Sequence, residues 1–171
     1  MSSHDRIRRQ QLVLQAEGYL ELGMPRHALD VLARCGDLES LPDHALYLQG
    51  ECLRALDQFR EALQPLTKAA AGSPNNVHVW LSLGWCYKRT GRLDMAIESL
   101  QEALAVEPND ALVHYNLACY WSLAKNKRQA LSFLSRAIDL KDHYRTLVAA
   151  ESDFDPIRSD PAFQALVRVT V

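Results

Sequence analysis

The stretch from Trp80 to Pro108 decides the fold. It reads Trp80-x-x-Leu83-Gly84-x-x-Tyr87, followed by Gly91, Ala96, Leu100, Ala103 and Pro108. Apolar and small residues recur at helical spacing on both sides of Gly91, which predicts helices over 77–89 and 93–106. Gly91 lets the chain turn between them, because a left-handed backbone costs glycine little. Pro108 ends the second helix, and Asn109-Asp110 caps the next one.

The same pattern returns every 34 residues. One column is always alanine and a second always leucine: Ala28, Ala62, Ala96, Ala130, and Leu32, Leu66, Leu100, Leu134. Three more columns keep residue size: Ala16, Gly50, Gly84, Ala118; Cys35, Ala69, Ala103, Ala137; and Tyr19, Leu53, Tyr87, Trp121. Four identical residues share a column by chance about once in a thousand columns. The chain is therefore a repeat protein, in which stacked helix pairs bury a common core.

The copy at 77–110 resembles the tetratricopeptide repeat, W-x2-L-G-x2-Y…A-x3-F…P. Its Leu100 stands where an aromatic residue is usual, and His114 replaces the tryptophan in the following copy. The resemblance implies an all-α fold, a right-handed α-solenoid of four helix-turn-helix repeats with C-terminal capping helices. The expected segments are an N-terminal helix extension at 1–8, repeats at 9–42, 43–76, 77–110 and 111–144, and a capping segment at 145–171.

Two segments depart from the regular pattern. Pro65 falls inside the second helix of the second copy, where it removes a backbone hydrogen bond and predicts a kink, a restart of the helix, or a tolerated irregularity. After Leu140 the repeat fades; residues 141–150 predict a helix, and Asp160-Pro161 predicts the start of a short last one. The tail is similar to closing segments of bacterial tetratricopeptide proteins, which implies that it covers the apolar end of the last repeat.

Composition and motifs exclude several classes of function. The net charge of −2 is unlike the basic surface that nucleic acid requires. No apolar run is long enough to span a membrane, and no apolar region follows the basic N-terminus, so we expect a cytoplasmic protein without a secretory signal. The four cysteines form no C-x-x-C pair, which predicts reduced and mostly buried thiols.

We find no catalytic motif in the sequence and predict a protein that is not an enzyme and needs no cofactor or metal. His44 and His78 share a repeat column and could hold a metal with Cys119, but solvated histidines are the simpler interpretation. Asp153, Asp155 and Asp160 lack the central glycine and late glutamate of a calcium loop.

A binding surface is predicted on the first helix of each repeat, which the resemblance places on the concave wall. In the helix at 77–89, the face opposite the core stripe carries His78, Leu81, Trp85 and Lys88. Equivalent positions elsewhere complete the predicted groove: His44, Tyr47, Glu51, Arg54, His78, Leu81, Trp85, Lys88, Arg89, Tyr115, Asn116 and Cys119. The other interpretation is that Leu81 and Trp85 only pack between neighbouring helices.

The groove composition indicates the kind of ligand. Tyrosine, tryptophan and arginine most often dominate binding energy, and Arg54, Lys88 and Arg89 are basic. We therefore expect a peptide or protein segment with apolar anchors and some acidic character, bound by a scaffold or adaptor. The alternative is a dedicated chaperone, resembling small tetratricopeptide chaperones of bacterial secretion systems. Self-association through the solenoid ends is a further prediction, since Val13 and Leu20 near the first end are apolar.

Overall fold

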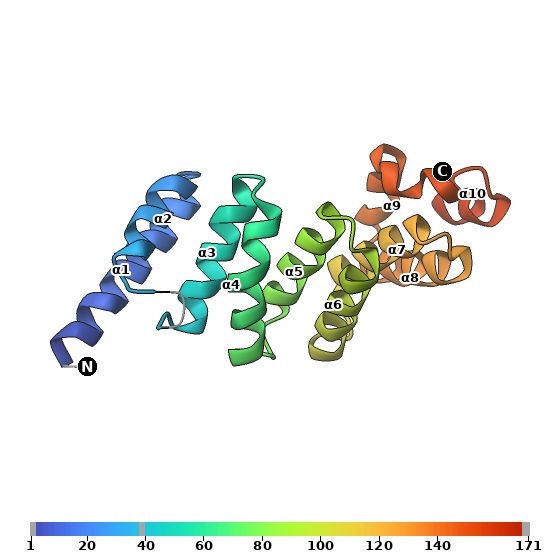
Figure 1. Ribbon diagram of the computed structural model, residues 1–171. Helices are drawn as coiled ribbons and strands as arrows, with labels where there is room; N and C mark the ends of the chain where they lie inside the picture. Colours follow the sequence, from blue (N-terminus) through green and yellow to red (C-terminus); the bar gives the residue numbers. More distant parts are fainter. Residues whose placement is uncertain (1–2, 38–39, 169–171) are drawn as a thin grey trace. The chain divides into compact units, whose positions relative to one another are not determined.

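The computed structural model describes residues 3–37 and 40–168, and the regular secondary structure of these residues is helical (Figure 1). The chain divides into two compact units, Met1–Thr90 and Gly91–Val171, here called the N-terminal and the C-terminal unit. The N-terminal unit contains α1 (Ser3–Glu21), α2 (Pro25–Ala33), α3 (Asp43–Ala55), α4 (Phe59–Gly72) and α5 (Val77–Arg89). The C-terminal unit contains α6 (Leu93–Val106), α7 (Ala111–Leu123), α8 (Lys127–Leu140), α9 (His143–Leu147), the 3₁₀ turns η1 (Val148–Ala150) and η2 (Ser152–Ile157), and α10 (Pro161–Val167).

Successive helices pair as the repeat predicts. Within the N-terminal unit α1 packs on α2 and α3 on α4, and within the C-terminal unit α7 packs on α8. The bounds of α5 and α6 confirm the helices expected over 77–89 and 93–106. Pro25 is the first residue of α2, the helix position that best tolerates proline.

A left-handed residue closes every turn between the two helices of a copy, again at a step of 34. The backbone angle φ is 70° at Gly23, 59° at Asp57, 78° at Gly91 and 58° at Lys125. The sequence indicated this conformation only at Gly91. Asp57 and Lys125 adopt it although they carry a Cβ, so the geometry of the hairpin overrides the preference of these two residues.

The small-residue columns are explained by the contact between α3 and α4. An added Cβ at Gly50 would fall far inside van der Waals contact with Cγ of Leu66. Leu66, Ala62 and Ala69 on α4 are completely buried. The two helices therefore approach as closely as they do because position 50 has no side chain.

Side chains cap the starts of α5, α7 and α10, as the sequence predicts for α7 and α10. The side chain of Asn76 accepts a hydrogen bond from the backbone N–H of His78 at 3.1 Å. Oδ1 of Asp110 accepts from the N–H groups of Leu112 at 2.7 Å and Val113 at 3.0 Å. Asp160 does the same for α10, so the Asp-Pro start predicted from the sequence is confirmed.

His114 replaces the repeat's tryptophan without losing its hydrogen bond. Nε1 of Trp80 donates to the carbonyl oxygen of Pro74 at 2.7 Å. One repeat later, Nε2 of His114 lies 2.9 Å from the carbonyl oxygen of Pro108. In each copy, therefore, a ring nitrogen of the first helix bonds the carbonyl oxygen of the proline six residues earlier. This shared bond explains why histidine can replace tryptophan at position 114 without loss of the fold.

Pro65 does not break its helix. α4 runs continuously from Phe59 to Gly72 with Pro65 buried inside it. Of the alternatives that the sequence left open, the restart of the helix is therefore wrong, and the continuous helix fits a tolerated irregularity. The neighbouring Leu66 and Ala62 are fully buried in the same core, and this packing holds the chain helical through the missing hydrogen bond.

The chain after Leu140 is less regular than predicted. The helix expected over 141–150 is divided into α9 and the 3₁₀ turn η1. η2 packs against α7, and its buried Phe154 lies 5.6 Å from Phe163 of α10 between ring centroids. The carbonyl oxygens of the segment are held by two arginines: Arg145 donates to Leu166, and Arg158 donates to Glu151 at 2.6 Å.

The exposed apolar residues of α1 are not the two that the sequence indicated. Val13 is buried and Leu20 is half-buried in the N-terminal core. Ile7 and Leu14 are exposed instead. In a search of the described residues, no helix had the length and apolar character that crossing a membrane requires.

We expect Gly50→Ala to destabilise the N-terminal unit by about 1–3 kcal/mol, since the new methyl group meets buried Leu66. Gly18→Ala is the matched control, because nothing lies within 4 Å of an added Cβ there. Its gain in helix propensity should leave stability unchanged or raise it by up to about 1 kcal/mol. Urea unfolding followed by circular dichroism measures both; equal effects of the two substitutions would contradict the close-approach argument.

Lys125→Gly should raise stability by roughly 1 kcal/mol, because glycine adopts positive φ without the steric cost that a Cβ carries. Lys125→Ala removes the same side chain but keeps the Cβ, so it should bring no such gain. Thermal melts of both variants test this, and a similar midpoint for the two would show that the turn is not strained.

Candidate binding site

The predicted surface of the N-terminal unit is carried by α3 and α5, which lie against each other. Tyr47, Glu51 and Arg54 follow one face of α3 at helical spacing. On α5, Ser82 and Trp85 are one turn apart. These five residues form the row that we call the α3–α5 surface.

Glu51 joins the two helices. Its carboxylate accepts two hydrogen bonds from Arg54, at 2.9 Å from Nε and 2.8 Å from Nη2. Oε1 also accepts the hydroxyl of Ser82 on α5 at 2.6 Å. The bond to Glu51 raises the pKa of Arg54, while burial followed by the charge of Glu51 raises the pKa of Tyr47 to about 12. Arg54 is thus fixed in orientation, and its Nη1 lies outside the pair.

Trp85 is the large aromatic residue at the edge of this surface, with 36% of its area exposed. Nζ of Lys88 lies 5.4 Å from the ring centroid of Trp85, and the guanidinium carbon of Arg89 lies 5.9 Å from it. Arg89 also stacks over Phe59 of α4 at 4.5 Å. Cations at these distances are attracted to the ring face and orient the indole.

The expected basic cluster is therefore divided. Arg54 is neutralised by Glu51, whereas Lys88 and Arg89 gather around Trp85. The sequence missed Ser82 and Phe59 as members of the site. Trp85 occupies the repeat column of Glu51, and Ser82 stands one helical turn before it on the same face of α5. This position was the sequence signal that could have identified Ser82 as part of the site.

The histidines and Leu81 lie around the row without forming a metal group. His44 is exposed, and its Nε2 lies 3.4 Å from Oε1 of Glu17 on α1. His78 is exposed and Leu81 is half-buried. Among residues 3–37 and 40–168, three residues that could bind a metal come together at Cys119, Glu151 and Asp153, and this cluster contains neither His44 nor His78.

Tyr115 and Cys119 of α7 correct the sequence prediction of an open surface. Tyr115 is only 7% exposed and Cys119 only 2%. The ring of Tyr115 stacks on Tyr144 at 4.7 Å between centroids and meets the edge of Phe154 at 5.8 Å. The C-terminal segment therefore covers this part of α7, and of the three predicted residues on it only Asn116 is partly exposed.

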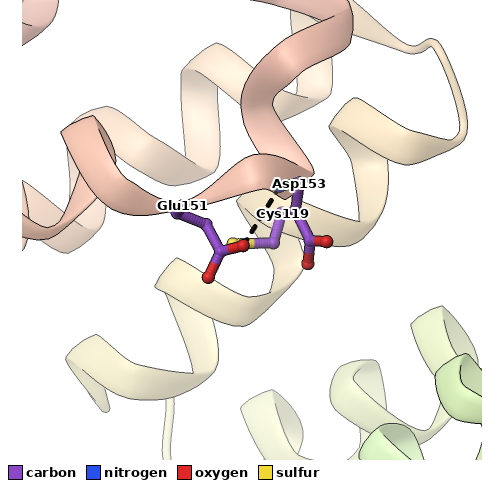
Figure 2. Close-up of side chains that lie close together, drawn as sticks. All are labelled: Cys119, Glu151 and Asp153. Atoms are coloured by element: carbon purple, nitrogen blue, oxygen red, sulfur yellow. Dashed lines mark hydrogen bonds between the residues drawn. The ribbon is translucent and has the colours of Figure 1, made fainter.

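A polar cluster lies where η2 meets α7 (Figure 2). The donor atoms of Cys119, Glu151 and Asp153 lie within 4.8 Å of one another. Glu151 Oε1 accepts the backbone N–H of Asp153 at 3.0 Å, so this carboxylate caps η2. Burial, followed by the nearby Cys119, Glu151 and Asp153, raises the pKa of Tyr115. Three donors of mixed kind fall short of the four that a structural zinc site uses.

The three aspartates weighed as a calcium loop go to separate partners. Asp153 belongs to the cluster with Cys119 and Glu151. Asp155 pairs with Arg158 at 2.8 Å. Asp160 caps α10 and accepts from Lys127 at 2.7 Å. Their arrangement is that of caps and ion pairs that hold the C-terminal segment in place.

The four cysteines, one in each copy, are buried thiols, as the sequence predicts. Burial raises the pKa of Cys52 to about 12 and that of Cys86 to about 11. Thiols of this kind are protonated and unreactive at neutral pH.

Comparison with known proteins agrees with the repeat architecture. A model of the tetratricopeptide repeat matches residues 53–118. No curated protein matches the sequence. This match covers the middle of the chain, and the 34-residue register and the paired helices on both sides of it agree with the same repeat architecture.

Solved structures share the fold at low sequence identity. MamA 41-end from Desulfovibrio magneticus RS-1 is 19% identical, with a TM-score of 0.73 and coverage of 92% of each chain. TTC0263, a thermophilic TPR protein of Thermus thermophilus, is 20% identical, with a TM-score of 0.66 over 92% of this chain and 94% of that one. YrrB, described as a TPR protein with an unusual peptide-binding site, is 25% identical, with a TM-score of 0.71 over 79% of this chain and 70% of that one.

Stability should fall in alkali. Because burial raises the pKa values of Cys52 and Cys86 above their usual 9.0, the folded state keeps protons that the unfolded state releases. The unfolded state then binds fewer protons, so stability is lost as pH rises from about 9 towards 11. Each thiol should cost about 2 kcal/mol near pH 10.5. Urea unfolding at several pH values tests this; a Cys52→Ala, Cys86→Ala variant should show a flatter decline, and an unchanged slope would contradict the assignment.

Proposed function

We propose that this protein is a non-catalytic interaction module, a scaffold or adaptor, that binds a peptide or protein segment on its concave groove. The observation that carries the proposal is the partly exposed Trp85, oriented by Lys88 and Arg89 beside the fixed row of Tyr47, Glu51 and Arg54. Tryptophan, tyrosine and arginine are the residue types that dominate binding energy at protein interfaces.

The ligand chemistry follows from the two parts of the surface. Trp85 offers an apolar contact with positive charge at its rim, which suits an apolar side chain next to an acidic one. Arg54 is held by Glu51 and directs Nη1 away from that pair, which suits a carbonyl or carboxylate oxygen of the ligand. His44, His78 and Leu81 border these contacts and are proposed to complete the groove in the N-terminal unit. In the C-terminal unit, the partly exposed Asn116 on α7 is proposed as a contact of its own.

Two further points support binding over catalysis. The perturbed thiols and phenols have pKa values raised by burial, which makes them weaker nucleophiles at neutral pH. YrrB, which shares the fold, is described as having a peptide-binding site.

A double variant tests the proposal. Tyr47→Ala, Trp85→Ala should lose partners that the wild-type protein recovers from native lysate, by about tenfold or more in quantitative mass spectrometry, which corresponds to about 1.4 kcal/mol. The matched control is Ile7→Ala, Leu14→Ala, which also removes two large side chains but from the exposed face of α1.

Circular dichroism must show that both variants are helical. Partners that stay with the control and leave the double variant would support binding at the α3–α5 surface. Equal recovery by wild type and double variant would place the binding elsewhere and refute the proposal.

A further inference from the structure

α6 and α7 lie side by side in the C-terminal unit (Figure 1). A second surface of distinct chemistry is lined by residues of α6 and of the end of α7. It is a cavity of about 400 Å³, which we call the α6–α7 groove. Its lining residues are Leu93, Asp94, Ile97, Glu98, Gln101, Trp121 and Ala124. Most of the lining surface is apolar, and a cavity of this size accepts a large side chain from a partner.

The edge of the groove is acidic. Asp94 and Glu98 are exposed, and Glu102 continues the line one turn further along α6. α6 has the sequence LDMAIESLQEALAV and carries no lysine or arginine. Asp94 lies in the first turn of α6, where a carboxylate stabilises the helix. Glu98 and Glu102 follow at i+4 and i+8, where like charges repel one another and weaken an isolated helix, so their position is not explained by the stability of α6.

The lysines at the turn between α7 and α8 do not line this groove and so do not neutralise the negative charge of its edge. Lys125 and Lys127 line a different hollow, together with Pro156, Ile157 and Asp160 of the C-terminal segment. Lys127 donates to Asp160 at 2.7 Å. Asp94 and Glu98 are the charged residues among those that line the α6–α7 groove.

Trp121 adds an unsatisfied donor. Its indole Nε1 is buried and has no hydrogen-bond partner within the described part of the chain. Leaving a buried N–H unpaired costs about 1–3 kcal/mol. A ligand that enters the groove and lets the ring rotate slightly could supply an acceptor for this N–H, which is a source of binding energy that the apolar walls alone do not provide.

We propose that the α6–α7 groove docks a basic amphipathic helix of a partner protein. Large apolar side chains of that helix fill the space beside Ile97 and Trp121. Its lysines or arginines pair with Asp94 and Glu98, whose four-residue spacing along α6 is about 6 Å and equals the rise between i and i+4 of a second helix. This site is separate from the α3–α5 surface and selects the opposite charge.

The test uses the full chain labelled with ¹⁵N. Trp80, Trp85 and Trp121 give three indole N–H signals, which single Trp→Phe variants assign. The probe is an acetylated, amidated helical peptide of about four turns, or about 14 residues, with leucines on one face and arginines at i, i+4 beside them. A counterpart peptide carries glutamate in place of every arginine.

We expect the basic peptide to shift the Trp121 indole signal, and the acidic peptide to leave it in place. Asp94→Asn, Glu98→Gln should weaken the basic peptide about fivefold, as two partly exposed ion pairs allow. Glu107→Gln, Asp139→Asn is the matched control; it neutralises the same number of exposed carboxylates away from the groove and should leave the affinity unchanged.

Three results would overturn the inference. They are an unmoved Trp121 signal with the basic peptide, equal binding of both peptides, and equal weakening by the two double variants. The Trp85 signal reports on the α3–α5 surface separately, so failure here is distinguishable from failure of the proposed function.

Discussion

The close approach of paired helices is the constraint on which the rest of the fold depends. Gly50 faces the buried Leu66 at a distance that excludes even one methyl group. A neighbouring column holds alanine on the second helix of each copy, at Ala28, Ala62, Ala96 and Ala130, and these alanines are fully buried. Because the side chains between the paired helices are small, the helices come close together, and leucines and aromatic residues fill the remaining space. The core is therefore closely packed. Pro65 is held helical by that packing.

The sequence predicts what repeats and fails where the chain stops repeating. The bounds of α5 and α6, the turn at Gly91 and the caps at Asn76 and Asp110 depend on local signals that recur every 34 residues. The hydrogen bond from His114 to Pro108 shows how much the fold tolerates, because a different ring satisfies the same carbonyl group. Asp57 and Lys125 were missed because only the tertiary hairpin forces them to positive φ.

The candidate site was predictable in part for the same reason. The face of α5 with Trp85 follows from helical periodicity, and its partial exposure agrees with the sequence. The pairing of Arg54 with Glu51, and of Glu51 with Ser82, depends on how two helices meet, which periodicity does not encode. Tyr115 and Cys119 are buried by the chain that follows Leu140, where the repeat fades. The aromatic contacts of Tyr144 and Phe154 have no signature at the 34-residue step.

The C-terminal segment also limits how this protein could change length. Tyr144, Phe154 and η2 occupy the face of α7 on which a further helix pair would have to stack. A copy of the repeat added after residue 144 would meet a surface that is already filled and would separate α7 from its cover. A copy inserted between two existing repeats would pack on its neighbours in the same way as the present copies do. It would leave the cover formed by Tyr144, Phe154 and η2 on α7 intact. Lengthening by duplication is therefore compatible with this architecture inside the array and incompatible with it at residue 144.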